Sequence, residues 1–288
     1  MKFGLGAPYA MGAIEEGDYA ARFARIAEDL GFESLWTVEH VVMVPEYASR
    51  YPYHPSGRSP FSAEVTQPDP LIWLAYVAAA TQRIRLATGV LIVPQRNPVV
   101  LAKTLATLDR LSGGRLLIGA GVGWVREEAE AVGVDFDDRG ARMDESIEAM
   151  RALWREPVSH YAGEHFRFDG VVSKPKPAQP GGVPILIGGH SKAAARRAGR
   201  LGDGFYPLGV DDARFAELQG VMNEAARVAG RDPAAIEVTL GGDLGAESAE
   251  RNARLGAART VVYPPTGDLD ALPSKLERFR RDVLERFA

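Results

Sequence analysis

The sequence has no cysteine at any of its 288 positions. Disulfide bonds, thiolate metal sites and cysteine nucleophiles are therefore excluded together. Any redox chemistry must come from a bound cofactor, because the chain has no thiol that could carry it.

An excess of charge of one sign is also lacking. The chain has 34 basic and 38 acidic residues, and the basic residues are dispersed along it. The sequence therefore gives no sign of the basic surface that a protein needs to bind nucleic acid. Hydrophobic residues make up 46% and charged residues 25%, which is typical of a globular protein rather than a disordered or membrane protein. Met1 to Pro8 lack the features of a signal peptide, so we expect a cytoplasmic protein.

Short apolar runs recur along the chain with amphipathic segments between them, a pattern typical of parallel α/β architecture. Eight runs are predicted as strands, at Phe3–Ala7, Ser34–Val38, Ile84–Val93, Leu116–Val122, Pro184–Gly188, Gly204–Gly209, Ile236–Gly241 and Thr260–Tyr263. Most are apolar on both faces, as buried parallel strands are. Eight strand–helix units in 288 residues favour one (β/α)8 TIM barrel over an open sheet, and we expect a single domain over 1–288.

The segments between the strands predict helices. These lie at Tyr19–Gly31, Pro70–Thr81, Pro98–Leu111, Met143–Trp154, Lys192–Leu201, Phe215–Ala229, Ser248–Gly256 and Ser274–Phe287. Capping signals support several boundaries. We expect Asp18 to cap the first helix and Gly31 to close it. Asp69 and Asn97 each precede a proline that opens a helix, and Gly230 ends another.

Two segments are longer than the connections that alternating strands and helices need. Val41 to Pro68 is long and follows the second strand, where active-site loops of a barrel lie, so it is a candidate substrate loop. Its aromatic side chains could line a pocket or only pin the loop to the surface; they are Tyr47, Tyr51, Tyr53 and Phe61. Pro157 to Val183, an insertion before the fifth strand, alternates apolar and polar residues and predicts a hairpin followed by an extended connection.

Candidate site residues gather at the strand ends, because barrel active sites lie at the C-terminal face of the strands. The runs Gly119–Trp124 and Ile187–Ser191 are glycine-rich turns from strand to helix. Such turns expose backbone N–H groups that can hold a phosphate, although glycine can also simply close a tight turn. Neither turn is a P-loop or a dinucleotide fingerprint.

His40 follows the second strand beside Glu39 and could transfer a proton, hydrogen-bond a cofactor or serve structure alone. No pair of histidines has the spacing of a zinc protease, so we expect no metal site. Ser191 resembles a helix N-cap or a phosphate ligand rather than a nucleophile, because no G-x-S-x-G elbow is present.

Taken in order, the motifs resemble the luciferase-like monooxygenase superfamily, and within it the F420-dependent oxidoreductases. The matching segments are Trp36–His40, Thr88–Leu91, Arg96–Pro98, Leu108–Arg115, Gly119–Trp124 and Ile187–Gly189. Each motif is weak alone, but the ordered set spans most of the chain.

The resemblance implies a barrel that binds coenzyme F420 or FMN at its C-terminal mouth, usually as a homodimer. Glu39 and His40 would face the cofactor ring as catalytic residues, and a non-proline cis peptide would join Gly89 to Val90. The cofactor would lie along Thr88, Gly89, Val90, Gly121, Val122, Gly123, Trp124, Gly188, Gly189, His190 and Ser191.

The expected activity is hydride transfer between F420 and a small organic substrate. One alternative is an FMN-dependent two-component monooxygenase on the same fold, and another is a non-catalytic flavin-binding barrel. An isomerase or aldolase would need a lysine at a strand end, and none is found there. Arg50, Arg58 and Arg96 form no dense basic cluster near the expected mouth, which argues against a phosphorylated sugar as substrate.

Overall fold

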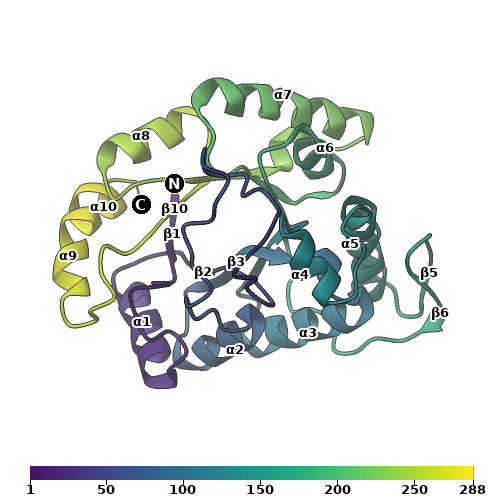
Figure 1. Ribbon diagram of the computed structural model, residues 1–288, viewed down its shortest axis with the longest axis horizontal. Coiled ribbons are helices and arrows are strands. Elements are labelled where there is room, and N and C mark those ends of the chain that lie inside the picture. The colour runs from purple at the N-terminus through teal and green to yellow at the C-terminus, as the bar shows by residue number, and fades with distance from the viewer. Residues whose placement is uncertain (288) are drawn as a thin grey trace.

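The computed structural model describes residues 1–287 and shows a closed barrel of eight parallel strands. Around the barrel the strands follow the order β1, β10, β9, β8, β7, β4, β3, β2. Helices surround it, as Figure 1 shows. The predicted (β/α)8 fold is confirmed.

The barrel strands match the eight predicted runs closely. They are β1 (Lys2–Gly6), β2 (Ser34–Thr37), β3 (Arg85–Ile92), β4 (Leu116–Gly121), β7 (Ile185–Gly188), β8 (Gly204–Tyr206), β9 (Glu237–Gly241) and β10 (Arg259–Val262). The largest difference is β8, which was expected to reach Gly209 and instead stops at Tyr206. The next residue is Pro207, which has no N–H to donate to a strand ladder.

The outer helices lie between the strands, as predicted. They are α1 (Gly17–Asp29), α2 (Pro70–Ala80), α3 (Pro98–Leu111), α5 (Arg139–Arg155), α6 (Lys192–Leu201), α7 (Asp212–Val228), α8 (Ala246–Arg254), α9 (Leu272–Phe279) and α10 (Glu285–Phe287). A π-helical stretch, Arg280–Leu284, joins the last two. No described helix, within residues 1–287, is long and apolar enough to span a membrane.

Most of the expected caps are present. Asp69 accepts hydrogen bonds from the first turn of α2, Asn97 does the same for α3, and Gly31 and Gly230 follow their helices with positive φ angles of 89° and 68°. The prediction for Asp18 was wrong. Helix α1 starts earlier, at Gly17, so Asp18 lies in its first turn, where its charge favours the helix dipole instead of capping it.

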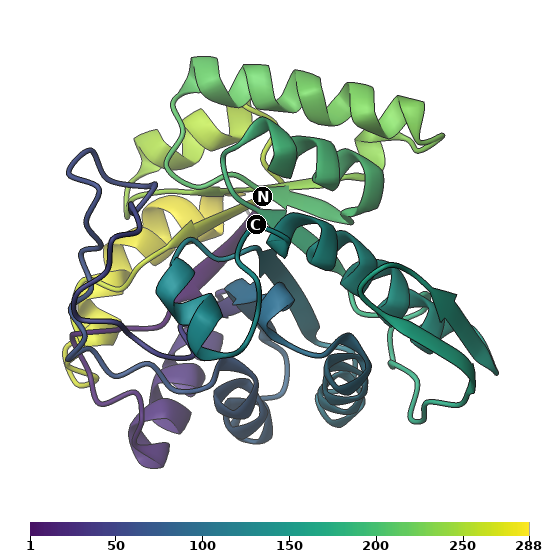
Figure 2. The ribbon, with the colours of Figure 1, turned by 45° about the vertical axis from the view of Figure 1, so that its right-hand side comes forward.

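The two predicted additions are present. The hairpin pairs β5 (Ser159–Ala162) with β6 (Arg167–Val171) in antiparallel fashion and projects from the barrel (Figure 2). The long segment after β2 crosses the mouth of the barrel in Figure 1. A short helix that the sequence pattern did not predict, α4 (Arg126–Ala131), follows β4 and lies near this segment.

Candidate active site

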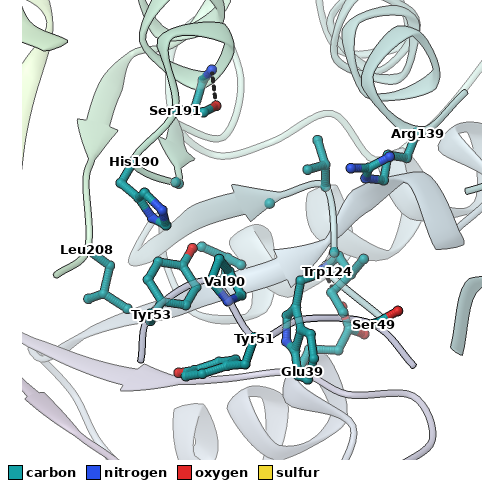
Figure 3. Close-up of a pocket in the computed structure, with 18 of the residues that line it drawn as sticks. Glu39, Ser49, Tyr51, Tyr53, Val90, Trp124, Arg139, His190, Ser191 and Leu208 are labelled. Atoms are coloured by element: carbon teal, nitrogen blue, oxygen red, sulfur yellow. Dashed lines mark hydrogen bonds between the residues drawn. The ribbon is translucent and has the colours of Figure 1, made fainter. Parts of the chain in front are cut away.

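A cavity of about 910 Å³ opens at the C-terminal ends of the barrel strands. All but two of the predicted site residues line it, namely Glu39, His40, Tyr51, Tyr53, Phe61, Gly89, Val90, Gly121, Val122, Gly123, Trp124, Gly188, Gly189, His190 and Ser191. The fold therefore brings four separate strand ends and the long loop to one place (Figure 3). Their individual roles stay predictions.

Thr88 and Tyr47 do not line this cavity. The Thr88 side chain is buried and donates a 2.8 Å hydrogen bond to the carbonyl of Gly119, so it joins β3 to β4. The Tyr47 ring packs against Trp124 at 5.1 Å between centroids, and its hydroxyl accepts a hydrogen bond from the backbone of Ser59. Tyr47 thus packs against Trp124, which lines the cavity, without lining the cavity itself.

The floor of the cavity is built on a bulge in β3. The strand register shifts between Gly89 and Leu91, and the peptide bond between Gly89 and Val90 is cis, as the resemblance implied. Val90 then occupies the space beside two glycines, Gly121 on β4 and Gly188 on β7. A Cβ at Gly121 or at Gly188 would come within 2.4 Å of a Val90 methyl carbon. Only glycine fits at those positions with Val90 as placed.

One end of the cavity is suited to an anion. The turns contain Gly123 and Gly189, whose φ angles of 78° and 115° lie in the left-handed region that glycine tolerates. Ser191 caps α6 by accepting a 3.1 Å hydrogen bond from the N–H of Ala194. The first turn of a helix leaves backbone N–H groups unpaired and carries a partial positive charge.

Two arginines line this same end, and sequence reasoning missed both. Arg139 lies over the ring of Phe136 at 3.7 Å, and its buried Nε has no hydrogen-bond partner within residues 1–287. Burial lowers the pKa of Arg139 from its usual value. Arg197 is already engaged by Asp144 and by the carbonyl of Gly140. Arg139 donates from Nη1 to the carbonyl of Phe136 and thus differs from Arg197 in its buried, unpartnered Nε.

His190 lies on the opposite wall from Trp124, next to Tyr53 and Leu208 (Figure 3). Its ring is 4.8 Å from that of Tyr53, centroid to centroid, and its Nδ1 is buried with no partner in the described part of the chain. Burial, and then the charge of Arg214, lower the pKa of His190. An imidazole with an unused buried nitrogen, whose neutral form is favoured, therefore lines the cavity.

Glu39 is committed to structural contacts. Its carboxylate accepts a hydrogen bond from the N–H of Ile92 and pairs with Arg96, which also bonds Asp69 at 2.7 Å. Although burial opposes the charge on Arg96, the two carboxylates outweigh it and raise the pKa of its guanidinium. Glu39 thus ties the end of β2 to the end of β3.

His40 has a different environment. Its Nδ1 lies 2.9 Å from Oε2 of Glu128 on α4, and that carboxylate is fully buried. The imidazole packs edge to face against Trp124, with centroids 5.9 Å apart. Only 12% of the His40 side chain is exposed. Its position is therefore fixed on two sides.

A model of the family described as luciferase-like monooxygenase matches residues 1–280 of the chain. The chain belongs to the luciferase-like monooxygenase family. It is therefore an oxidoreductase enzyme, and the resemblance drawn from its motifs is confirmed.

Several known proteins resemble this luciferase-like enzyme. An F420-dependent glucose-6-phosphate dehydrogenase of Kineococcus radiotolerans is 32% identical over 253 residues, which are 84% of this chain and 69% of that relative. The crystal structure of monooxygenase RslO1 from Streptomyces bottropensis matches with a TM-score of 0.79 at 24% identity over 100% of both chains. An F420-dependent secondary alcohol dehydrogenase, in complex with an F420-acetone adduct, matches with a TM-score of 0.76 at 18% identity over 96% of this chain and 97% of that one. The two solved structures show a shared fold.

The luciferase-like enzyme also places residues in the cavity that its motifs did not single out. Tyr206, Leu208 and Tyr263 line it from β8 and β10. Tyr206 is buried against Trp36, with ring centroids 5.2 Å apart. These residues follow or end strands, so their position along the barrel was the signal that could have identified them.

Proposed function

We propose that this luciferase-like enzyme transfers a hydride between coenzyme F420 and a small organic substrate. The observation that carries the proposal is that one cavity combines a glycine-lined floor, an anion-binding helix end and a fixed histidine. The 32% identical relative named as F420-dependent supports F420 over FMN.

The residues present fit a planar cofactor with a phosphate. Gly121 and Gly188 leave room for the Val90 side chain to pack against them, and a flat ring can then lie against that side chain. The unpartnered Nδ1 of His190 and Nε of Arg139 are buried polar atoms that a ligand would satisfy. The N-terminus of α6 and Arg139 would hold the phosphate.

When bound, F420 would supply the hydride chemistry. Val90 and the glycines would hold the ring, and the long loop with Trp124 would exclude water from the reacting atoms. Nε2 of His40, the ring nitrogen that Glu128 does not engage, exchanges a proton with the substrate.

The lining of the substrate end of the cavity favours an uncharged, ring-bearing molecule as the substrate. Aromatic side chains line it, among them Tyr51, Tyr53 and Phe61. The nearby arginines are already engaged: Arg50 with the carbonyl of Pro55, Arg58 with Tyr47, Arg96 with Glu39, and Arg126 with Asp137. Because these four arginines make separate contacts within the protein and form no dense basic cluster, we do not extend the relative's substrate to this enzyme.

The cofactor is tested by fluorescence titration of the purified protein with F420 and with FMN, each oxidised and reduced. We expect F420 to bind in the micromolar range and FMN much more weakly. Preference for reduced FMN would instead indicate a two-component monooxygenase. Binding of none of the four would indicate that the cavity serves neither cofactor.

We also propose that the enzyme is a homodimer joined through α2 and α3. Helix α2 has the sequence PLIWLAYVAAA and carries no charge on any face. A helix that is apolar all round is normally buried, yet Ile72 and Tyr76 are 73% and 51% exposed. On the neighbouring α3, Val99 and Val100 are 40% and 65% exposed. A second copy of the chain would cover this face.

A further inference from the structure

The buried carboxylate of Glu128 lies at the meeting point of the catalytic histidine and the substrate loop. Its Oε2 is 2.9 Å from Nδ1 of His40. Its Oε1 accepts hydrogen bonds from the N–H of Val41 at 2.6 Å and of Val42 at 3.4 Å. Glu128 is fully buried, and a buried carboxylate is stable only when donors satisfy it.

The contact with Glu128 determines where the hydrogen on the His40 ring sits. A carboxylate only accepts hydrogen bonds, so Nδ1 must carry the hydrogen in this contact. In the neutral imidazole, Nε2 is then the atom with the free lone pair. Because His40 lines the cavity, this leaves Nε2 available to the bound substrate.

Helix α4 also holds the substrate loop at a second point, through Glu127, the residue before Glu128. Val125, at the N-cap of α4, makes no side-chain capping bond, and Ser49 supplies one instead by accepting from the N–H of Arg126 at 2.9 Å. Ser49 also donates to Oε2 of Glu127 at 2.8 Å. Oε1 of Glu127 accepts from the N–H of Ala48 at 2.5 Å.

The two adjacent glutamates therefore differ in one respect. Both hold the backbone of the substrate loop, but only Glu128 also contacts the histidine. This makes Glu127 a matched control for every effect that comes from loosening the loop or from removing a negative charge from α4.

We propose that Glu128 is a positioning residue that fixes His40 as the Nδ1–H tautomer and couples its orientation to the seated substrate loop. The role given to His40 rests on the proposed function. A proton leaving the substrate moves to Nε2, and the resulting imidazolium is stabilised by the Glu128 carboxylate; in the reverse direction Nε2 returns the proton. The His40–Glu128 pair takes up and releases only this one proton.

The tautomer can be measured directly on protein labelled with ¹⁵N-histidine, by long-range ¹H–¹⁵N correlation above the histidine titration range. The chain has five histidines, and a His40→Asn variant identifies the His40 signals. We expect Nδ1 to appear as a protonated nitrogen and Nε2 as a bare one. A neutral His40 that is mainly Nε2–H in the wild type would overturn the proposal.

Glu128→Gln and Glu127→Gln then separate positioning from loop anchoring. We expect Glu128→Gln to convert His40 to a mixture of tautomers, because an amide can donate to Nδ1 as well as accept from it. Glu127→Gln should leave the wild-type tautomer in place. An unchanged tautomer in folded Glu128→Gln would refute the positioning role. Since no cofactor is added, failure of F420 to bind would not alter any of these results.

Discussion

Gly188 on β7 lies against Val90 on β3, close enough that a Cβ at Gly188 would be 2.4 Å from a Val90 methyl carbon. This contact sets the floor of the cavity, because Val90 projects into space that any other residue at position 188 would fill. The nearest backbone atom to that Cβ, the carbonyl oxygen of Ala120, is 3.4 Å away, so the Val90 side chain would have to move first.

We therefore expect Gly188→Ala to weaken F420 binding while leaving the barrel folded. Overpacking costs about 1–3 kcal/mol, which the free protein can relieve by moving Val90 into the ring site. Cofactor binding then has to reverse that movement, so we expect the affinity to fall by up to the same amount, roughly 5- to 150-fold. Fluorescence titration measures the loss, and circular dichroism checks the fold. Gly220→Ala is the control, because a Cβ there meets nothing within 4 Å. Equal affinities of Gly188→Ala and wild type would show that the ring lies elsewhere.

The second prediction concerns the anion end of the cavity. Arg139→Met should reduce affinity for F420 by about tenfold or more, since a charge-assisted hydrogen bond contributes roughly 1.5–3 kcal/mol. It should also flatten the dependence of affinity on salt concentration, because fewer charges then meet the phosphate. Titrations at several salt concentrations measure both effects.

The control for Arg139 is three residues further along the same helix. Arg142→Met also removes one guanidinium from α5, but Arg142 packs over Phe166 at 5.0 Å and does not line the cavity. Its affinity and salt dependence should equal those of the wild type. If both variants lose affinity equally, the effect comes from the net charge of the helix and not from a contact with the phosphate.

Local sequence features were sufficient to predict most of the fold. The range of α6 was predicted without error, and Ser191, which the sequence suggested as an N-cap, caps it. The starts of α2 and α3 were equally clear from Asp69-Pro70 and Asn97-Pro98. These signals act within a few residues, so one sequence contains all the information they need.

The contacts that complete the site are long-range, and no local pattern reveals them. Helix α4 takes its cap from Ser49, 77 residues away, and His40 meets Glu128 across 88 residues. In the sequence, Glu127 and Glu128 belong to a charged run that is typical of any exposed helix. The ends of β2 and β4 come to the same mouth only because both strands pair in parallel with β3.

The third prediction tests the homodimer. Wild-type protein should scatter light as a species of about twice 31.1 kDa. Ile72→Glu should shift it to the monomer, because a charge buried in an apolar interface is costly. Val228→Glu on α7 is the control, since Val228 is also exposed, at 80%, but lies outside the α2–α3 face. A monomeric wild type would refute the dimer, and dissociation by Val228→Glu alone would place the interface on α7.

The last prediction concerns alkaline pH. Burial, with a smaller effect of Tyr51, raises the pKa of Tyr53 from 10.0 to about 12. Because this phenol ionises more easily once the loop has left the barrel, its contribution to stability is complete below pH 10. That contribution is lost as the pH rises to about 12. The free energy that holds the loop on the barrel then falls by an amount on the order of 2–3 kcal/mol.

A near-ultraviolet phenolate titration of wild type minus Tyr53→Phe should show one group ionising near pH 12 in the folded protein and near pH 10 in denaturant. A difference curve centred near pH 10 in both conditions would mean that Tyr53 is exposed to water and that the loop does not cover the cavity.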